Sequence, residues 1–346
     1  MAYTTINKST DYFNNKIYTG NGSTNAITGV GHQPDLVWIK SRTEAHHHRL
    51  FDAVRGATKK IFSSQTNAES TDAGSLTSFD ADGFTHAGGD TDGNGNGQSY
   101  ASWNWKANGT GSANTDGSIS STVSANTTSG FSIVKYTGNG TNNATVGHAL
   151  NATPKLLIGK CLGTVSNWQV VGNFGSLTEG KYLILNEPNA IGTSSNVSFD
   201  ASATTVKFQG GQGLNISGQP HIAYCFADVT GYSKFGTYYG NGSTDGTFIY
   251  TGFKPAWVMV HALDSAQGWW MFDNKRDNDG NAIGKRLGAE RTDSEATGDK
   301  LDFVSNGFKW RDGDNAWNYA SGHQYIYMCF AEAPLVGSNG VTAKAR

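Results

Sequence analysis

Residues 18–22 read Tyr-Thr-Gly-Asn-Gly, and this string recurs at residues 136–140 and, shortened to Tyr-Gly-Asn-Gly, at residues 239–242. Its first glycine, Gly20, recurs at steps of 118 and 102 residues. Self-similarity at a nearly fixed spacing is the signature of a repeat architecture. The sequence therefore predicts three copies of one unit of roughly 100 residues.

Two further landmarks follow each copy of the string in the same order. In the first landmark a proline precedes an unbroken apolar run, which is typical of a strand covered on both faces, with the proline at its first position. The second landmark closes the unit with an aromatic-rich segment. The proline landmark occupies residues 34–40, 154–160 and 255–261 in the three copies. The closing landmark occupies residues 100–107, 221–228 and 325–332.

The closing landmark alternates with a period of two. In the first copy Ala101, Trp103 and Trp105 share one side, and the third copy places Met328 and its neighbours in the same phase. One face of each closing strand is therefore predicted to be core. Cys225 and Cys329 fall on the opposite face, and we expect them to be small, semi-buried residues rather than nucleophiles.

Turn signals separate these strands. Residues 79–84 and 303–308 place Asp-Gly or Asn-Gly just before an aromatic residue, as a tight hairpin turn requires. The second copy lacks this glycine at residues 199–204, so its turn is expected to be longer.

These strand and turn patterns predict an all-β fold of three tandem β-sandwich domains of the jelly-roll or concanavalin-like type. The predicted units are residues 1–107, 108–116 (a flexible Gly/Ser/Asn-rich linker), 117–229, 230–333 and 334–346 (a polar tail).

Composition limits the classes of partner. Net charge is −2, and charged residues make up only 16% of the chain, so neither nucleic acid nor an anionic membrane surface is an expected partner. No apolar stretch approaches the length of a membrane-spanning helix, and no secretory signal is visible at the start. Three widely spaced cysteines without a CxxC pair favour neither a disulfide framework nor a zinc site.

Acidic loops are the candidate metal ligands. Asp90, Asp92 and Asn94 fit the first half of a calcium-binding loop, but the twelfth position, which should be glutamate, is Ala101. The third copy offers Asp312 and Asp314 in the corresponding loop. Such loops are more often solvated turns, so the expected cofactor is none, with structural calcium as the weaker alternative.

Tryptophans are concentrated in the third copy. Trp269, Trp310 and Trp317 lie there, and exposed indoles stack on sugars or fill pockets in a partner. These three residues are the candidate contacts with glycan or a neighbouring protein. The alternative is that they are simply core.

Two further motifs carry little chemistry. Asn186-Glu187-Pro188 is reminiscent of a glycosidase acid/base motif, but the chain lacks the βα pattern that would bring a second carboxylate to it. In His46-His47-His48, consecutive strand residues point to opposite faces, so a metal site is not expected. No catalytic residue is assigned.

Several strings of the chain resemble a known group of proteins. "GVGHQPDLVWIKSR", "RLFDAVRGATK", "SFDADGF", "NTDGSISSTVSANTTSGFSIVKYTGNG" and "YIYMCFAEAPLVGSN" are similar to a tandem-repeat virion protein family of marine tailed bacteriophages. The similarity runs essentially end to end. This chain has His32 where family copies often have phenylalanine. The resemblance implies a virion structural or tail-fibre protein with a concanavalin-like sandwich fold, and it implies no catalytic residues.

The expected function follows from the resemblance and the composition together. We expect a non-enzymatic protein on the exterior of the phage particle, in a fibre-like tail appendage that binds host surface glycan or packs on other virion proteins. A homo-oligomer, such as a trimer, is expected because virions multiply their chains by symmetry. The alternatives are a head-decoration protein and, with the least support, a glycan-cleaving enzyme.

Overall fold

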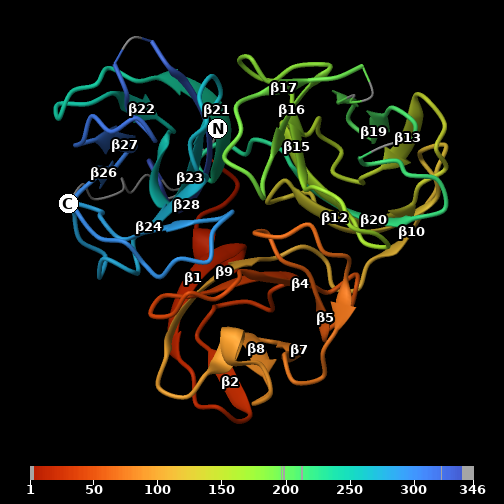
Figure 1. The fold of residues 1–346 in the computed structure, drawn as a ribbon, viewed down its shortest axis with the longest axis horizontal. Coiled ribbons are helices and arrows are strands. Elements are labelled where there is room, and N and C mark those ends of the chain that lie inside the picture. Colours follow the sequence, from red (N-terminus) through yellow and green to blue (C-terminus); the bar gives the residue numbers. More distant parts are fainter. Residues whose placement is uncertain (1–3, 196, 198, 212, 321, 337–346) are drawn as a thin grey trace.

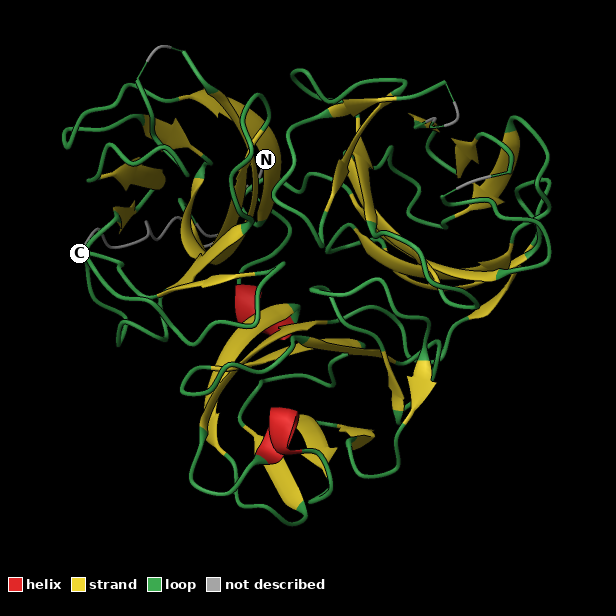
Figure 2. Cartoon of the chain, in the orientation of Figure 1, coloured by secondary structure: helices red, strands yellow, loops and turns green. Residues whose placement is uncertain are grey.

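The computed structural model of the protein describes residues 4–195, 197, 199–211, 213–320 and 322–336. Strands make up nearly all of its regular structure, and the helical segments of this described part are η1 (Ser9–Asp11) and α1 (Thr91–Asn94) (Figure 2). The strands pair into several antiparallel sheets. The structure therefore confirms the prediction of an all-β sandwich fold.

The first repeat consists of a major sheet of order β1-β9-β3-β4, a minor sheet of order β2-β8-β7, and a short pair β5-β6. Their bounds are β1 Phe13–Thr19, β2 Asn25–Thr28, β3 Leu36–Ser41, β4 Arg49–Asp52, β5 Lys59–Lys60, β6 Ser70–Thr71, β7 Leu76–Asp80, β8 Gly83–His86 and β9 Ser99–Trp105.

The second repeat has a larger major sheet of order β10-β11-β12-β20-β14-β15-β16-β17 and a minor sheet of order β13-β19-β18. Their bounds are β10 Ser112–Asn114, β11 Ser121–Asn126, β12 Phe131–Thr137, β13 Ala144–Gly147, β14 Leu156–Cys161, β15 Gln169–Gly172, β16 Lys181–Ile184, β17 Gly192–Thr193, β18 Asp200–Ala201, β19 Thr205–Phe208 and β20 Pro220–Phe226.

The third repeat has a major sheet of order β21-β28-β23-β24-β25 and a minor sheet of order β22-β27-β26. Their bounds are β21 Ser233–Tyr239, β22 Phe248–Tyr250, β23 Phe253–Ala262, β24 Trp270–Asp273, β25 Arg286–Gly288, β26 Leu301–Val304, β27 Gly307–Trp310 and β28 Gln324–Pro334.

The same strand order recurs in the three repeats. The strand that carries the opening string pairs with the closing strand, which in turn pairs with the strand of the proline landmark. The register also agrees, because the tyrosine two residues before the first glycine of each opening string faces the first residue of the closing landmark: Tyr18↔Tyr100, Tyr136↔His221 and Tyr238↔Tyr325. The division into separate domains at residues 107, 116, 229 and 333 stays a prediction.

The minor-sheet hairpins follow the turn signals. Two residues separate β7 from β8 and β26 from β27, whereas three separate β18 from β19 in the second repeat, which lacks the glycine. Phe79 pairs with Phe84, and Phe303 pairs with Phe308, across the two tight turns. The longer turn expected of the second repeat is thus present.

A core shared by all three repeats fills the centre of the molecule. Figure 1 shows three lobes around this centre, with the major sheets facing inward and the minor sheets at the periphery. The inward side chains of all three closing strands belong to one buried cluster: Trp103, Trp105, Tyr224, Phe226, Met328 and Phe330. The opposite faces of the same strands fill a separate core within each sandwich.

The cysteines of the closing strands are therefore fully buried. We expected Cys225 and Cys329 to be semi-buried, but both have no exposed surface. Burial raises the pKa of Cys225 to about 12 and that of Cys329 well above its usual value. The prediction failed because the repeats cover one face of each closing strand and the minor sheets cover the other.

Equivalent hydrogen bonds join the lobes in a ring. Trp168 Nε1 donates to the carbonyl oxygen of Phe62 (2.7 Å), and Trp269 Nε1 donates to that of Ile184 (2.9 Å). His48 occupies the same position in the first repeat, and its Nε2 lies 2.9 Å from the carbonyl oxygen of Gly288. Trp38 Nε1 donates to Nδ1 of His48, so Nε2 carries the proton and donates to Gly288.

A second set of contacts repeats around the same ring. Main-chain nitrogens of each repeat donate to the next one: Glu69 to Leu162 (2.9 Å), Ile191 to Leu263 (2.8 Å) and Glu295 to Arg42 (2.8 Å). Each repeat contacts both others with equivalent residues. The chain is thus a closed ring of three lobes with approximate threefold symmetry.

The segment predicted as a flexible linker is part of a sheet. Within residues 108–116, Ser112–Asn114 forms β10 and pairs with β11, and the main-chain nitrogen of Gly109 donates to Asp35 Oδ1 (3.1 Å). The prediction is wrong because a polar, glycine-rich sequence still forms a strand where a neighbouring edge offers hydrogen bonds. In the predicted tail, Pro334 ends β28, and residues 337–346 lie outside the described residues.

Candidate functional site

A buried asparagine fixes the loop at one end of each sandwich. In the first repeat, Asn94 Oδ1 accepts from the main-chain nitrogen of Asn21 (3.1 Å). Its Nδ2 donates to the carbonyl oxygens of Ser23 (2.6 Å) and Ala87 (3.2 Å). The opening Gly-Asn-Gly loop is therefore held by a side chain whose donors and acceptor are all used.

The other repeats use the equivalent asparagine in the same way. Asn215 Oδ1 accepts from the main-chain nitrogen of Asn139 (2.9 Å), and Asn318 Oδ1 accepts from that of Asn241 (3.1 Å). A Cβ on Gly138 would lie 2.4 Å from a carbonyl oxygen of the clamping loop, which explains why each copy needs glycine at this position. Each sandwich thus ends in a rigid pair of loops.

Among the described residues, only the third repeat places exposed aromatic rings at this end of its sandwich. Tyr239 is 59% exposed and stands where the first two repeats have Thr19 and Thr137. Tyr319 is 38% exposed and follows the clamping asparagine, where the other repeats have glycine or isoleucine. On one shared backbone framework, the third repeat therefore carries a different surface.

Polar side chains lie beside these rings. His323 packs against Tyr319 with the ring centroids 5.1 Å apart and donates from Nδ1 to Asp264 Oδ1 (2.7 Å). Gln324 lies beside Tyr239, with its Nε2 3.4 Å from the hydroxyl, and its main-chain nitrogen donates to Asp264 Oδ2 (3.0 Å). We call these five residues, Tyr239, Tyr319, His323, Asp264 and Gln324, the repeat 3 loop site.

The tryptophans predicted to contact glycan are not at this surface. Trp269, Trp310 and Trp317 are 2%, 0% and 2% exposed, respectively. Trp269 stacks on His261 in the interface between repeats, and Trp310 stacks on Trp317 inside the third sandwich. The structure contradicts their assignment as contact residues, because the sandwich and the ring both need large side chains to fill their cores.

The predicted calcium ligands of the first repeat are used in ion pairs. Asp90 accepts from Arg49 Nε and Nη2 (both 3.0 Å) and from Ser75 Oγ (2.7 Å), while Asp92 pairs with Arg49 and His46. Burial raises the pKa of Asp90, but hydrogen bonds and the charge of Arg49 outweigh it and lower the pKa to about 2. The third predicted ligand, Asn94, is the clamp described above.

The acidic pair of the third repeat also has local partners. Asp312 pairs with Lys300, and Asp314 Oδ1 accepts from the main-chain nitrogen of Ala316 (2.9 Å). No group of three or more His, Cys, Asp or Glu side chains in the described part of the chain is arranged to hold a metal ion. In this structure Asp90, Asp92, Asp312 and Asp314 are thus engaged by cationic side chains or main-chain groups of the protein itself.

The remaining motifs have structural partners. Asn186 Oδ1 accepts from the main-chain nitrogen of Trp168 (2.8 Å), so this motif fixes a turn. The three histidines diverge: His46 pairs with Asp92, His47 contacts Ser64, and His48 is buried between lobes. The expectation that they do not converge is confirmed.

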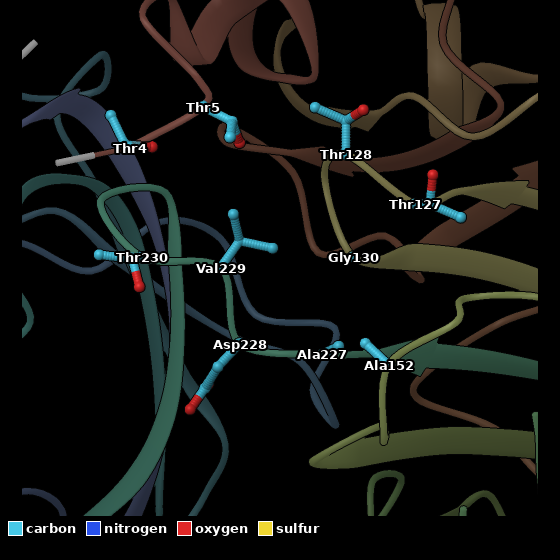
Figure 3. A pocket seen from close by; sticks show the side chains of 10 residues that line it. All are labelled: Thr4, Thr5, Thr127, Thr128, Gly130, Ala152, Ala227, Asp228, Val229 and Thr230. Carbon is cyan, nitrogen blue, oxygen red and sulfur yellow. The ribbon is translucent and has the colours of Figure 1, made fainter. Parts of the chain in front are cut away.

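A groove of about 520 Å³ lies where the N-terminal segment meets the junction of repeats 2 and 3 (Figure 3). Half of its lining residues are threonines, and the full lining comprises Thr4, Thr5, Thr127, Thr128, Gly130, Ala152, Ala227, Asp228, Val229 and Thr230. It contains no aromatic ring. The groove is therefore a weaker candidate for sugar binding than the repeat 3 loop site.

The sequence contained the signal for the repeat 3 loop site. Aligning the opening strings shows tyrosine in place of threonine at Tyr239, and aligning the clamping asparagines shows Tyr319 in a small or aliphatic position. Counting tryptophans pointed to the same repeat but to side chains that are buried. Positions at which the third repeat differs from the other two identified the exposed rings, whereas residue type alone did not.

None of the helices in the described residues is long and apolar enough to span a membrane. Comparison with curated proteins and with solved structures gave no match. Residues 8–334 match the profile of a family described as a domain of unknown function, DUF7483. This match covers nearly the whole ring of three lobes, and the chain belongs to the DUF7483 family.

Proposed function

We propose that the protein is a non-enzymatic structural component of the exterior of a bacteriophage particle, in a fibre-like tail appendage, and that it binds host surface glycan through the repeat 3 loop site. The resemblance of the sequence to phage tandem-repeat proteins supports the location. The observation that carries the binding role is that two exposed tyrosines, Tyr239 and Tyr319, occur on this loop end only in the third repeat.

The chemistry of the site suits a neutral sugar. The apolar C–H face of a pyranose can stack on an exposed tyrosine ring, whose body is apolar and whose hydroxyl bonds to water or ligand. Asp264 and Gln324 place a carboxylate and an amide next to the rings, where sugar hydroxyls could bond to them. Because the clamped loops are already rigid, little conformational entropy would be lost on binding.

Single sites of this kind bind weakly, and a virion would compensate by presenting many copies. Linking several sites converts later binding events into intramolecular ones and raises the apparent affinity by orders of magnitude. A homo-oligomer in the particle is part of the proposal. The ring of three lobes within one chain does not replace it, because only one lobe carries the loop site.

A glycan array probed with the protein immobilised in multivalent form tests the binding role. The matched variant, Tyr239→Thr with Tyr319→Ile, restores the side chains of Thr137 and Ile216 in the second repeat. We expect at least a tenfold loss of binding to the recognised glycan at an unchanged Tm. Val165→Thr, which alters an exposed aliphatic side chain of the second repeat, is the control and should bind normally.

Two outcomes would overturn this role: no binding to any glycan at high valency, or full binding by the double variant. Release of reducing ends from host polysaccharide would instead support the third candidate, a glycan-cleaving enzyme.

A head-decoration protein is the second candidate function. The observation that favours it is the closed ring, because three equivalent lobes around one axis match a threefold position of a capsid lattice. Immunogold labelling of intact particles separates the two locations. Label confined to the head would replace the tail assignment.

A further inference from the structure

In the second repeat, a passing segment of the chain covers the edge of the minor sheet. Ile119 forms a parallel bridge with Val146 of β13, and its main-chain nitrogen donates to the carbonyl oxygen of Thr145 (2.9 Å). Ser118 Oγ accepts from the main-chain nitrogen of Thr145 (2.9 Å). The N–H and C=O groups of Thr145, which point away from the neighbouring strand β19, are therefore both hydrogen-bonded by the segment before β11.

The equivalent strand of the third repeat is β22. Ile249 pairs with Phe308 as Val146 pairs with Val206. The main-chain nitrogen of Trp310 donates to the carbonyl oxygen of Thr247 (3.2 Å), and that of Thr251 donates to the carbonyl oxygen of Asn306 (3.0 Å). These bonds show that every second residue from Thr247 to Thr251 turns its main-chain groups toward the neighbouring strand β27.

That alternation means that the main chain of Ile249 bonds to β27, whereas the N–H and C=O groups of Phe248 and Tyr250 point to the open side. Among the described residues, no segment of the chain hydrogen-bonds to this side of β22. The reason is visible in the chain path: only a short turn, Val229–Ser233, joins repeats 2 and 3, so no linker passes this edge.

The open edge carries aromatic side chains. Phe248 is 45% exposed and Tyr250 is 52% exposed, and both lie on the outer face of the minor sheet. The same two positions hold Ala26 and Thr28 in the first repeat, and the second repeat has no aromatic residue there either. Lys309 pairs with Asp245 (2.6 Å) beside them, so the strip is apolar with a charged rim.

Natural proteins usually cover or charge an exposed edge strand, because such an edge recruits further strands. An edge that instead carries exposed aromatic side chains has the composition of a docking site. In Figure 1, β22 lies at the periphery, on the side of its lobe away from the other two lobes. The exposure of Phe248 and Tyr250 leaves its outer face accessible to another molecule.

We propose that the edge of β22 binds an extended segment of a neighbouring protein, which adds to the minor sheet as a parallel strand. The occupant has the chemistry of residues 117–119 in the second repeat: an uncharged stretch in which a small polar residue precedes a β-branched apolar one. Its main-chain N–H donates to the carbonyl oxygen of Phe248. Its apolar side chain lies on the buried face with Ile249, as Ile119 lies with Val146, and its small flanking side chains lie beside Phe248 and Tyr250. This proposal does not depend on the glycan role.

A synthetic peptide with the sequence of residues 114–122 (NTDGSISST), labelled with fluorescein, tests the proposal with the full chain. We expect saturable binding by fluorescence anisotropy and slower hydrogen exchange at residues 248–250. A scrambled peptide should not bind. Absence of saturable binding, or protection that appears only in β13 or β2, would overturn the proposal.

Two further reagents locate the contact. The double variant Phe248→Ala with Tyr250→Thr gives β22 the side chains of Ala26 and Thr28, and we expect it to bind the peptide at least tenfold more weakly. If this variant does not fold, a peptide N-methylated at its isoleucine removes the N–H donated to Phe248 while the protein stays intact. Equal binding of the N-methylated and unmodified peptides would contradict a strand-addition mode.

Discussion

The indole nitrogen of Trp168 donates a hydrogen bond of 2.7 Å to the carbonyl oxygen of Phe62, and this bond connects the second repeat to the first. Trp269 and His48 make the same contact at the other two interfaces. The interfaces that close the ring thus use one equivalent position three times, with tryptophan at two interfaces and histidine at the third.

Trp168→Phe removes this donor and keeps an aromatic ring in the buried site. We expect the free energy of unfolding to fall by roughly 1–3 kcal/mol, because the Phe62 carbonyl loses its hydrogen-bond donor and the fully buried site of Trp168 is filled by a smaller ring. Urea denaturation monitored by circular dichroism measures the change. Trp269→Phe should cost a similar amount, and a neutral effect of both variants would show that these bonds contribute nothing to stability.

Asn94→Ala is expected to destabilise the loop end of the first repeat. Asn94 is buried and satisfies main-chain groups of Asn21, Ser23 and Ala87, which would be left without it. A loss of roughly 1–3 kcal/mol is expected, because several hydrogen bonds of a buried side chain are lost together. Asn96→Ala, at an exposed position two residues away, is the control and should change the melting temperature little.

His221 predicts a specific acid sensitivity. Burial lowers its pKa to about 4, whereas in the unfolded chain it is near 6.5. The folded state therefore binds fewer protons between these values, and the stabilisation is complete above pH 6.5 and is lost as the pH falls toward 4. The difference corresponds to at most about 3 kcal/mol.

The variant His221→Tyr isolates this contribution, because tyrosine occupies the equivalent positions 100 and 325. Its ring can stack on Tyr136 as His221 does, at a centroid distance of 5.2 Å. We expect the variant to lose less stability than the wild type between pH 6.5 and 4, in denaturation curves collected across that range. Parallel pH profiles would rule out this origin.

Removing divalent metal should leave stability unchanged. Asp90 and Asp92 already form ion pairs with Arg49, and Asp312 forms one with Lys300. A ligand that binds only the folded state must raise the melting temperature, so EDTA would lower it if calcium were bound. A drop of several degrees on adding EDTA, reversed by calcium, would contradict this reading of the acidic loops.

The free thiols should not react in the folded state. Cys161, Cys225 and Cys329 are unpaired and fully buried. Burial also raises the pKa of Cys225 and Cys329, which suppresses the reactive thiolate. DTNB should detect no thiol in native buffer and all three after denaturation. Rapid labelling of the native protein would indicate local opening of the closing strands.

The sequence by itself determined the repeat, the strand positions and the all-β class. These follow from local patterns, because a period of two, a leading proline and an Asn-Gly or Asp-Gly turn constrain the backbone wherever they occur. The matching register of Tyr18 with Tyr100 and of Tyr238 with Tyr325 shows that the opening and closing strands pair in the same way in the first and third copies.

Tertiary structure alone decided what covers each face. Periodicity assigns Trp103 and Tyr100 to opposite sides of one strand, but it cannot say that another lobe buries the first and a minor sheet the second. For the same reason Trp310 and Trp317 became core and residues 112–114 became a strand. Burial and strand pairing depend on contacts between residues far apart in the chain, and no local pattern encodes those contacts.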